Sequence, residues 1–349
     1  MAAHPVSYAL LPVTPAPPYS WRQTVAALAG FGAVPDRGRP LGKGGQVIDA
    51  QDLTAVAAWE LPLRLGGPEG RCATVRLVPT EGEGPFAPDI ELLVSPAPSA
   101  APSAQPDDDD TASDPVHGDL TLGEAQSVWD QLDQFLALSL ELDPLVDEAR
   151  NDPAFQPVAA ALFGFHPPRF RSAFQAACWT VVRQRTPQKF AVATMARLSE
   201  LLGTPVAAPA GPPYSLFPTP GAVAHGAREA LLTATNNLRK VERLEGLAAE
   251  FAAVSEHDLA AADYDDATKW LRSLPGLGPW SAEQVMWRGL GRMERAPWRD
   301  TGALSAVSAV YTPGLTLVKG AARELARHYG DLQGVWLAYL KAHPRVRGA

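Results

Sequence analysis

The amino-acid sequence predicts an α+β protein, in which a small N-terminal α/β domain precedes a mostly α-helical domain. Segments in which apolar and polar residues alternate fall within the first hundred residues, and such alternation is typical of strands. After residue 120, apolar side chains recur every three or four positions, as on one face of a helix. The 349 residues are enough for two or three packed domains with a sizeable core.

Residues 1–95 are predicted to form the mixed α/β domain. An apolar helical stretch begins near Trp21 and ends near Gly30. Short alternating segments follow this stretch, and we expect each of them to be a strand: 55–65, 72–78 and 90–94.

Residues 96–118 are predicted to be a linker, because Pro, Ala and Ser dominate them and Asp107–Asp110 adds a run of like charge. Such a segment buries too little apolar surface to order itself, and an acidic run of this kind is usually solvated. Residues 119–349 follow as the helical domain, in which Gly- and Pro-rich clusters separate the helical runs.

The net charge of −8 argues at first sight against a nucleic-acid partner, but the charge is divided unevenly along the chain. Residues 1–150 carry 22 acidic and 8 basic side chains, a net charge of −14. Residues 151–349 carry 16 acidic and 22 basic side chains, a net charge of +6. This asymmetry indicates a basic working domain beside an acidic appendage, and the basic half is suited to binding phosphates.

Several classes of protein do not fit the sequence. It has no run of about 18 apolar residues, so no membrane span is predicted. The N-terminus lacks the basic start and apolar stretch of a signal peptide, so we expect a cytoplasmic protein. Two cysteines cannot supply the four thiolates of an iron–sulfur cluster, and the seven histidines show no metal-ligand spacing.

A helix–hairpin–helix is predicted at residues 265–290. The segment that begins at Leu271 has the sequence Leu-Arg-Ser-Leu-Pro-Gly-Leu-Gly-Pro-Trp-Ser-Ala-Glu. Gly276 and Gly278 allow a tight turn whose backbone can approach a phosphate closely. The amides at the start of the second helix, up to Ser281, would then point at that phosphate. Such a motif binds the DNA backbone and does not recognise base sequence.

About twenty residues after the hairpin, Asp300 stands where the next helix is predicted to begin. A hairpin followed at this distance by an aspartate resembles the helix–hairpin–helix DNA glycosylase superfamily. In that family the aspartate is the catalytic carboxylate, so the resemblance implies this role for Asp300. An aspartate is also a common helix cap, and the two roles are compatible because a helix N-terminus keeps a carboxylate ionised.

The resemblance implies hydrolysis of the bond between a damaged base and its sugar. Loss of the base leaves positive character on the sugar, and a nearby anion stabilises that transition state. Asp300 would also orient the attacking water. Bifunctional members of the family carry a lysine two residues after the second hairpin glycine, whereas this chain has Trp280 there. We therefore expect a monofunctional glycosylase that does not nick the strand.

Three residues are candidates for the base pocket. Trp280 is expected to stack on an extruded base, or else to be a core tryptophan. Gln284 and Trp336 are placed at the pocket by the resemblance, and simple packing is the alternative for both.

Within the superfamily the chain resembles the 3-methyladenine DNA glycosylase II branch over residues 120–345. The segments Leu142-Asp-Pro144 and Gly164-Phe-His-Pro-Pro168 resemble the lead-in of that branch. Gln184 matches its conserved-type glutamine, and Arg185 takes the place of an apolar side chain that fills the gap left by the flipped base. Arg185 is expected either to fill that gap or to bind a phosphate.

The family also implies a structural monovalent cation at the hairpin, held by the backbone carbonyls of Arg272, Leu274 and Gly276. No cofactor for catalysis is implied. Many basic residues, at 169–197 and 288–299, are further candidates for contact with DNA.

The sequence thus predicts a monomeric, nucleoid-associated glycosylase that acts on alkylated bases of the 3-methyladenine type in duplex DNA. Two alternatives stay open. One is a DNA-binding or damage-sensing protein without catalysis, which would need the hairpin but not Asp300. The other is a glycosylase for deaminated or oxidised bases.

Overall fold

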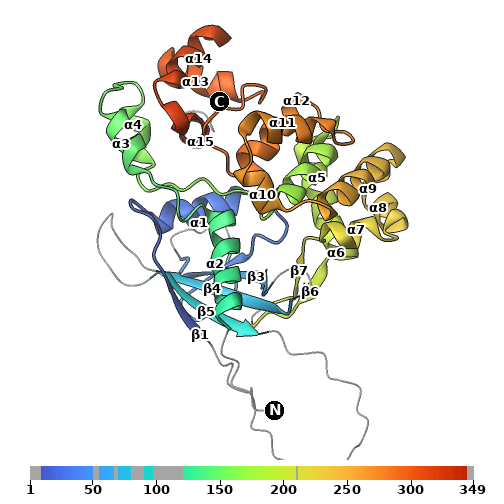
Figure 1. The fold of residues 1–349 in the computed structure, drawn as a ribbon. Coiled ribbons are helices and arrows are strands. Elements are labelled where there is room, and N and C mark those ends of the chain that lie inside the picture. The colour runs from blue at the N-terminus through green and yellow to red at the C-terminus, as the bar shows by residue number, and fades with distance from the viewer. Residues whose placement is uncertain are drawn as a thin grey trace, which may run out of the picture.

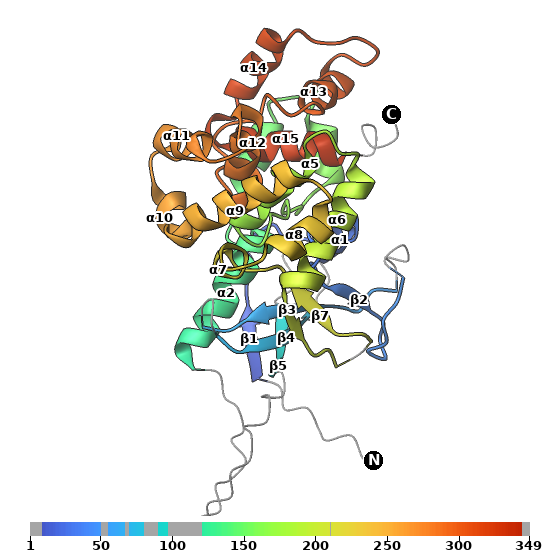
Figure 2. The same ribbon diagram turned by 90° about the vertical axis from the view of Figure 1, so that its right-hand side faces the viewer.

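The computed structural model describes residues 9–49, 55–66, 70–79, 90–96, 121–209 and 211–343. Figures 1 and 2 show a sheet at one end of the molecule and helices stacked on one side of it. The predicted linker beyond Pro96, with its acidic run, lies outside the described residues. None of the helices within the described ranges combines the length and the apolar character needed to cross a membrane.

Five strands form one antiparallel sheet in the order β1-β5-β4-β3-β2. They are β1 (Ala9–Val13), β2 (Arg39–Leu41), β3 (Ala58–Arg64), β4 (Cys72–Pro79) and β5 (Ile90–Pro96). The three predicted strands are confirmed as β3, β4 and β5. The other two were missed because β1 is apolar throughout and β2 has three residues, so neither shows alternation.

The helices follow the predicted pattern. α1 (Trp21–Gly30) belongs to the N-terminal part. The helical part contains α2 (Leu122–Leu136), α3 (Asp143–Ala149), α4 (Gln156–Ala161), α5 (Ala173–Arg183), α6 (Gln188–Leu202), α7 (Pro220–Ala224), α8 (Arg228–Thr235), α9 (Leu238–Ala252), α10 (Glu256–Ala261), α11 (Tyr264–Ser273), α12 (Pro279–Gln284), the π-helix η1 (Val285–Gly289), α13 (Ala303–Tyr311), α14 (Lys319–Arg327), the 3₁₀ turn η2 (Gly330–Leu332) and α15 (Gln333–Ala342).

One correction concerns the segment after α6, which was expected to be a loop between helices. It contains two short antiparallel strands, β6 (Thr204–Val206) and β7 (Tyr214–Leu216). Strands of three residues are too short to show a period of two, so alternation of apolar and polar residues could not predict them. Tyr214 donates a hydrogen bond to the Glu60 side chain on β3, which ties this hairpin to the main sheet.

The buried apolar residues form two clusters that do not coincide with the predicted domains. The first cluster joins the sheet and α1 to the helices α2, α5, α6, α9 and α11, so the α/β part and half of the helical part share one core. The second cluster joins α3 and α4 to α13, α14 and α15. η1 contributes Met286 to the first cluster and Trp287 to the second, so it lies where the two meet.

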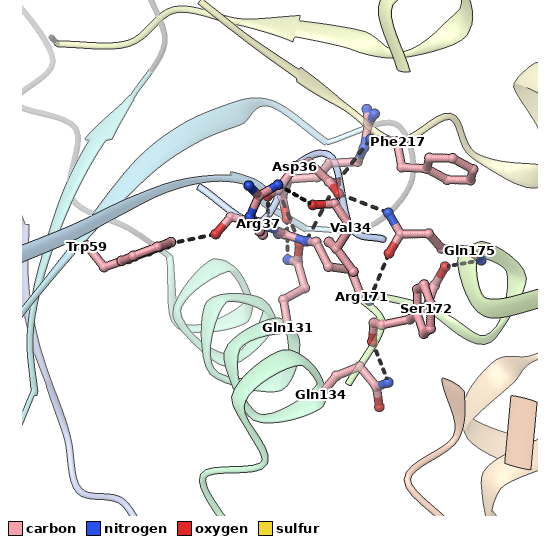
Figure 3. A network of polar contacts seen from close by, with 12 residues as sticks. Val34, Asp36, Arg37, Trp59, Gln131, Gln134, Arg171, Ser172, Gln175 and Phe217 are labelled. Carbon is pink, nitrogen blue, oxygen red and sulfur yellow. Dashed lines mark hydrogen bonds and ion pairs between the residues drawn. The ribbon is translucent and has the colours of Figure 1, made fainter. Parts of the chain in front are cut away.

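A polar joint ties the N-terminal part to the helical part (Figure 3). The buried Asp36 carboxylate accepts hydrogen bonds from Gln175 Nε2 at 2.9 Å and from the Phe217 backbone N–H at 3.1 Å. Arg171 Nη1 donates to the Asp36 backbone carbonyl at 3.0 Å, and its Nε lies 3.7 Å from Asp36 Oδ2. Burial lowers the pKa of Arg171, and the neighbouring Asp36 charge opposes this effect.

Candidate active site

The predicted helix–hairpin–helix is present as α11, a tight turn and α12. Gly276 has φ +80°, a conformation that favours glycine, and Gly278 is the residue before the first turn of α12. Pro279 occupies the first helical position, where its missing N–H has no consequence. Leu274 and Leu277 are buried and anchor the turn, Gly278 and Pro279 are exposed, and Gly276 is half-buried against the Arg243 side chain.

The helix after the hairpin changes its winding before it ends. η1 continues α12, and Leu290 N–H donates to the Val285 carbonyl at 2.8 Å, five residues back. A π-helical turn of this kind often lies at a functional site. Here it brings Trp287 and Arg288 toward the second core cluster.

The turn between α5 and α6 contacts the hairpin directly. Gln184 Nε2 donates to the Gly276 backbone carbonyl at 2.7 Å, and Gln184 Oε1 accepts from Arg243. Arg185 is exposed and has φ +50°, a strained conformation for a residue other than glycine. The structure thus brings together Gln184, Arg185 and Gly276, which were predicted from separate segments.

Ser281 was expected at the DNA contact, and the structure limits what it can offer. Its side chain is 3 % exposed. A side chain so buried cannot reach a phosphate, so only its backbone amide, in the first turn of α12, can take part.

Asp300 lies in a turn two residues before Gly302, which is the N-cap of α13. The prediction that Asp300 begins this helix is therefore wrong by a few residues, because Asp300 precedes the helix. Asp300 Oδ1 accepts from the Gly302 N–H at 2.9 Å and from Lys341 Nζ at 2.6 Å. Asp300 Oδ2 accepts from Gln284 Nε2 at 3.3 Å, so the predicted pocket residue Gln284 does contact the predicted catalytic carboxylate.

A cavity of about 410 Å³ is connected to this carboxylate through Lys341, and Asp300 itself is not among the residues that line it. That volume is within the range of small-molecule sites in proteins, roughly 300–1,000 Å³. Its walls come from the C-terminal end of α1, the segment 165–168, η1 and the last turn of α15: Ala27, Gly30, Phe31, Phe165, Pro167, Pro168, Trp287, Arg288, Met293, Ala338, Lys341 and Ala342. Lys341 joins the cavity to Asp300, because it lines the one and binds the other.

Arg288 forms a second positive charge in the cavity wall. Its Nη2 donates to the Pro168 carbonyl at 3.0 Å, and its guanidinium lies 4.3 Å from the centre of the Phe31 ring. Burial lowers the pKa of Arg288 to about 10, and the Asp300 charge opposes this effect. The group therefore stays protonated at neutral pH.

The two tryptophans predicted at the pocket do not line this cavity. Trp280 is half-buried on the first turn of α12. Trp336 is fully buried, its Nε1 donates to Tyr311 Oη at 3.1 Å, and its ring stacks on Tyr329 at 5.2 Å between centroids. The expectation for Trp336 is wrong in this structure, because a tryptophan without exposed surface offers no face to a base.

Sequence reasoning missed Phe31, Phe165, Trp287 and Lys341. Lys341 had one signal: it is a lone charge at the end of an otherwise apolar helix, α15. Arg288 was noticed only as a candidate for phosphate binding.

Most of the other candidate DNA-binding arginines are already paired with carboxylates. The pairs are Arg171 with Asp36, Arg197 with Glu200, Arg292 with Glu294, Arg295 with Asp265 and Arg299 with Glu283. Local carboxylates therefore neutralise much of the basic excess that the sequence shows. Near the hairpin, Arg185 and Lys189 are exposed.

The three carbonyls predicted to hold a cation lie at the hairpin. The Leu274 carbonyl accepts from the Leu277 N–H at 3.1 Å, and the Gly276 carbonyl accepts from Gln184. Each oxygen has two lone pairs, so each keeps one for a cation. Within the described ranges no cluster of three or more His, Cys, Asp or Glu side chains could hold a metal ion, and Cys72 and Cys178 are free thiols.

Comparison with known proteins places this fold. No protein-family model matches the chain. It is 24% identical over 209 residues to the DNA-3-methyladenine glycosylase of Bacillus subtilis, which covers 59% of this chain and 69% of that protein. It is 29% identical over 178 residues to the probable bifunctional transcriptional activator/DNA repair enzyme AlkA of Mycobacterium tuberculosis, which covers 50% of this chain and 35% of that longer protein.

Among solved structures, the 3-methyladenine DNA-glycosylase from Archaeoglobus fulgidus superposes with a TM-score of 0.68 at 20% identity. The match covers 95% of this chain and 96% of that one, so the whole architecture is shared. The matched fold, the sequence relatives and the hairpin that lies beside Asp300 agree with one another. The chain therefore has the fold of the Archaeoglobus 3-methyladenine DNA-glycosylase and is similar in sequence to the DNA-3-methyladenine glycosylase of Bacillus subtilis.

Proposed function

We propose that this chain is a monofunctional DNA glycosylase that hydrolyses the N-glycosidic bond of alkylated bases of the 3-methyladenine type in duplex DNA. One observation carries the proposal. The Asp300 carboxylate accepts hydrogen bonds from Lys341, which lines the 410 Å³ cavity, and from Gln284, which lies on the helix that follows the hairpin. The names of the Bacillus and Archaeoglobus proteins support the substrate class.

DNA binding would begin at the hairpin. Its backbone amides suit a phosphate, because the first turn of a helix has N–H groups without intrahelical partners. Arg185, exposed beside the hairpin, would enter the space that the extruded nucleotide leaves. Extrusion is required because an enzyme cannot reach the glycosidic bond of a base within the stack.

The chemical step follows from the position of one negative charge. The bond between the sugar C1′ and the base nitrogen breaks, and its electron pair leaves with the base. Asp300 stabilises the positive character that develops on the sugar. A water then bonds to C1′ and transfers a proton to Asp300, so the products are a free base and an abasic sugar in an intact strand.

Lys341 does not make the protein a lyase in this proposal. A lysine nucleophile needs a free lone pair on its nitrogen, whereas Lys341 Nζ donates a hydrogen bond to the Asp300 carboxylate at 2.6 Å. The position after the hairpin that carries the nucleophilic lysine in bifunctional family members is Trp280 here.

Removal of the Asp300 charge tests the proposal. Asp300→Asn keeps the shape of the side chain, and we expect single-turnover release of 3-methyladenine from methylated duplex DNA to fall about 10²–10³-fold. Affinity for DNA should change little. Asp265→Asn is the matched control. Asp265 is an exposed carboxylate paired with Arg295, and neither of the two residues lines the cavity.

The products distinguish the alternatives. Wild-type protein should leave an abasic strand and form no adduct that borohydride traps. Equal release by wild type and Asp300→Asn would remove Asp300 from the mechanism. Tight DNA binding with no base release by wild type from any lesion would favour a damage sensor without catalysis.

The structural cation is a separate proposal. The carbonyls of Arg272, Leu274 and Gly276 would hold a monovalent ion that stiffens the hairpin, and no chemical step depends on it.

A further inference from the structure

Helix α9 contacts the two loops to which DNA binding is assigned above. One is the turn between α5 and α6, which carries Arg185, and the other is the hairpin. Lys240 and Arg243, three residues apart on α9, both donate hydrogen bonds to the turn. A Cβ atom on Gly246 would lie 2.8 Å from Pro275 Cγ, so the body of α9 packs closely on the hairpin.

Lys240 holds the two ends of the α5–α6 turn together. Its Nζ donates to the Val182 carbonyl at 2.7 Å and to Thr186 Oγ1 at 2.6 Å. Val182 lies in the last turn of α5, where carbonyls have no partner within the helix. Thr186 Oγ1 in turn donates to the Gln184 carbonyl at 3.1 Å. The residues on both sides of Arg185 are therefore fixed, although Arg185 itself is exposed.

Arg243 joins the same turn to the hairpin. Its guanidinium donates to Gln184 Oε1, and Gln184 Nε2 donates to the Gly276 carbonyl at 2.7 Å. A Cβ atom on Gly276 would lie 2.6 Å from Arg243 Cδ, so the aliphatic part of Arg243 packs against the hairpin turn. Contacts that exist before DNA binds therefore set the distance between the turn and the hairpin.

The conformation of Arg185 explains why the turn needs such support. Arg185 has φ +50°, which a residue other than glycine keeps only where its surroundings impose it. A side chain that fills the gap left by an extruded base works best on a backbone that is already in place. Otherwise DNA binding must order the turn, and this ordering costs free energy.

We propose that Lys240 and Arg243 are positioning residues for base extrusion. They hold the Arg185 turn against the hairpin, so that Arg185 enters the duplex at a fixed distance from the phosphate that the hairpin binds. This inference rests on the proposed glycosylase function and on the role given there to Arg185. Lys240 and Arg243 act through Arg185 and not on the reacting atoms.

Two duplexes that differ in the cost of extrusion test the proposal. Each contains one 7-methylguanine, opposite cytosine in the first duplex and opposite an abasic-site analogue in the second. An unpaired base is easier to extrude, so its release depends less on Arg185. We expect Lys240→Met and Arg243→Met each to lower single-turnover release about tenfold from the first duplex and less than about twofold from the second. Lys240→Arg keeps the donors and should restore most of the loss.

A double variant and two single variants are the controls. Lys240→Met should cause no further loss in the Arg185→Ala protein, because both changes act through one side chain. Thr186→Val removes an acceptor on the turn and leaves α9 intact, and it should show the same pattern with a smaller loss. Arg239→Met removes an exposed charge next to Lys240 and should leave the ratio between the two duplexes unchanged.

The possible results separate the two proposals. No release by wild type from either duplex contradicts the proposed function itself. Equal losses from both duplexes, with the fold intact by circular dichroism, overturn the further inference and leave the function standing. Unchanged release from the first duplex, or a further loss in the Arg185→Ala protein, also overturns it. If Lys240→Met does not fold, the same comparison with Thr186→Val decides.

Discussion

Two arginines are buried in different settings, Arg171 at the polar joint and Arg288 in the cavity wall. They differ in how many of their donors have hydrogen-bond partners. At the joint, Arg171 donates to Asp36, and Asp36 in turn accepts from Gln175 and Phe217. At the cavity, Arg288 has one hydrogen bond to a carbonyl and a buried Nε without an acceptor. A satisfied charge network holds parts of a fold together, whereas a buried donor without an acceptor is a cost to the stability of the fold.

The largest expected effect is on stability at the joint. Arg171→Met removes the partner of a buried carboxylate, and breaking such a pair costs about 3–5 kcal/mol of unfolding free energy. Urea unfolding followed by tryptophan fluorescence measures this loss, and base release per folded molecule should not change. Arg197→Met is the control, because Arg197 forms an exposed pair with Glu200 that is worth at most about 1 kcal/mol. A loss at the joint as small as in this control would mean that packing alone holds the two parts together.

At the cavity, removal of the buried arginine is expected to change stability little. Arg288→Met removes a charge that burial makes unfavourable, and an apolar side chain of similar length can keep the contact with Phe31. We expect the free energy of unfolding to change by about 1 kcal/mol or less, in either direction. Single-turnover release of 3-methyladenine should fall in the same variant, because Arg288 lines the cavity. Should Arg288→Met destabilise the protein as much as Arg171→Met, the contrast between joint and cavity would be lost.

The same contrast explains what the sequence could predict. Gly276, Gly278 and Pro279 lie within four residues, and their backbone requirements are local, so the hairpin was predicted and found. Asp300 could be placed because it follows the hairpin at a family-like distance. Lys341 could not, because its contact with Asp300 joins residues 41 positions apart and depends on how α15 packs.

Tryptophan shows a second limit of the sequence. A pocket wall and a hydrophobic core demand the same apolar side chain at the same helical spacing, so pattern alone could not separate Trp336 from Trp287. The structure buries Trp336 completely and puts Trp287 in the cavity wall. The joint was equally hidden, since Asp36 and Arg171 are 135 positions apart and the pairing requires the folded sheet.

The smallest expected effect concerns the pH dependence of stability near the joint. Glu256, at the start of α10, accepts hydrogen bonds from the backbone N–H groups of Ala173 and Phe174 at 2.6 and 2.9 Å. Burial raises the pKa of this carboxyl above its ordinary value, and the two hydrogen bonds oppose the rise without cancelling it.

A carboxyl group whose pKa rises on folding favours the folded state when it is protonated. Its contribution is complete below the unfolded pKa of about 4.3 and is lost as the pH rises through the higher folded value. The unfolding free energy of wild type minus that of Glu256→Gln should therefore fall from pH 4 to pH 7. A rise of this quantity over the same range would show that the two backbone donors at the start of α5 outweigh burial, and Glu256 would then act as a charged cap of that helix.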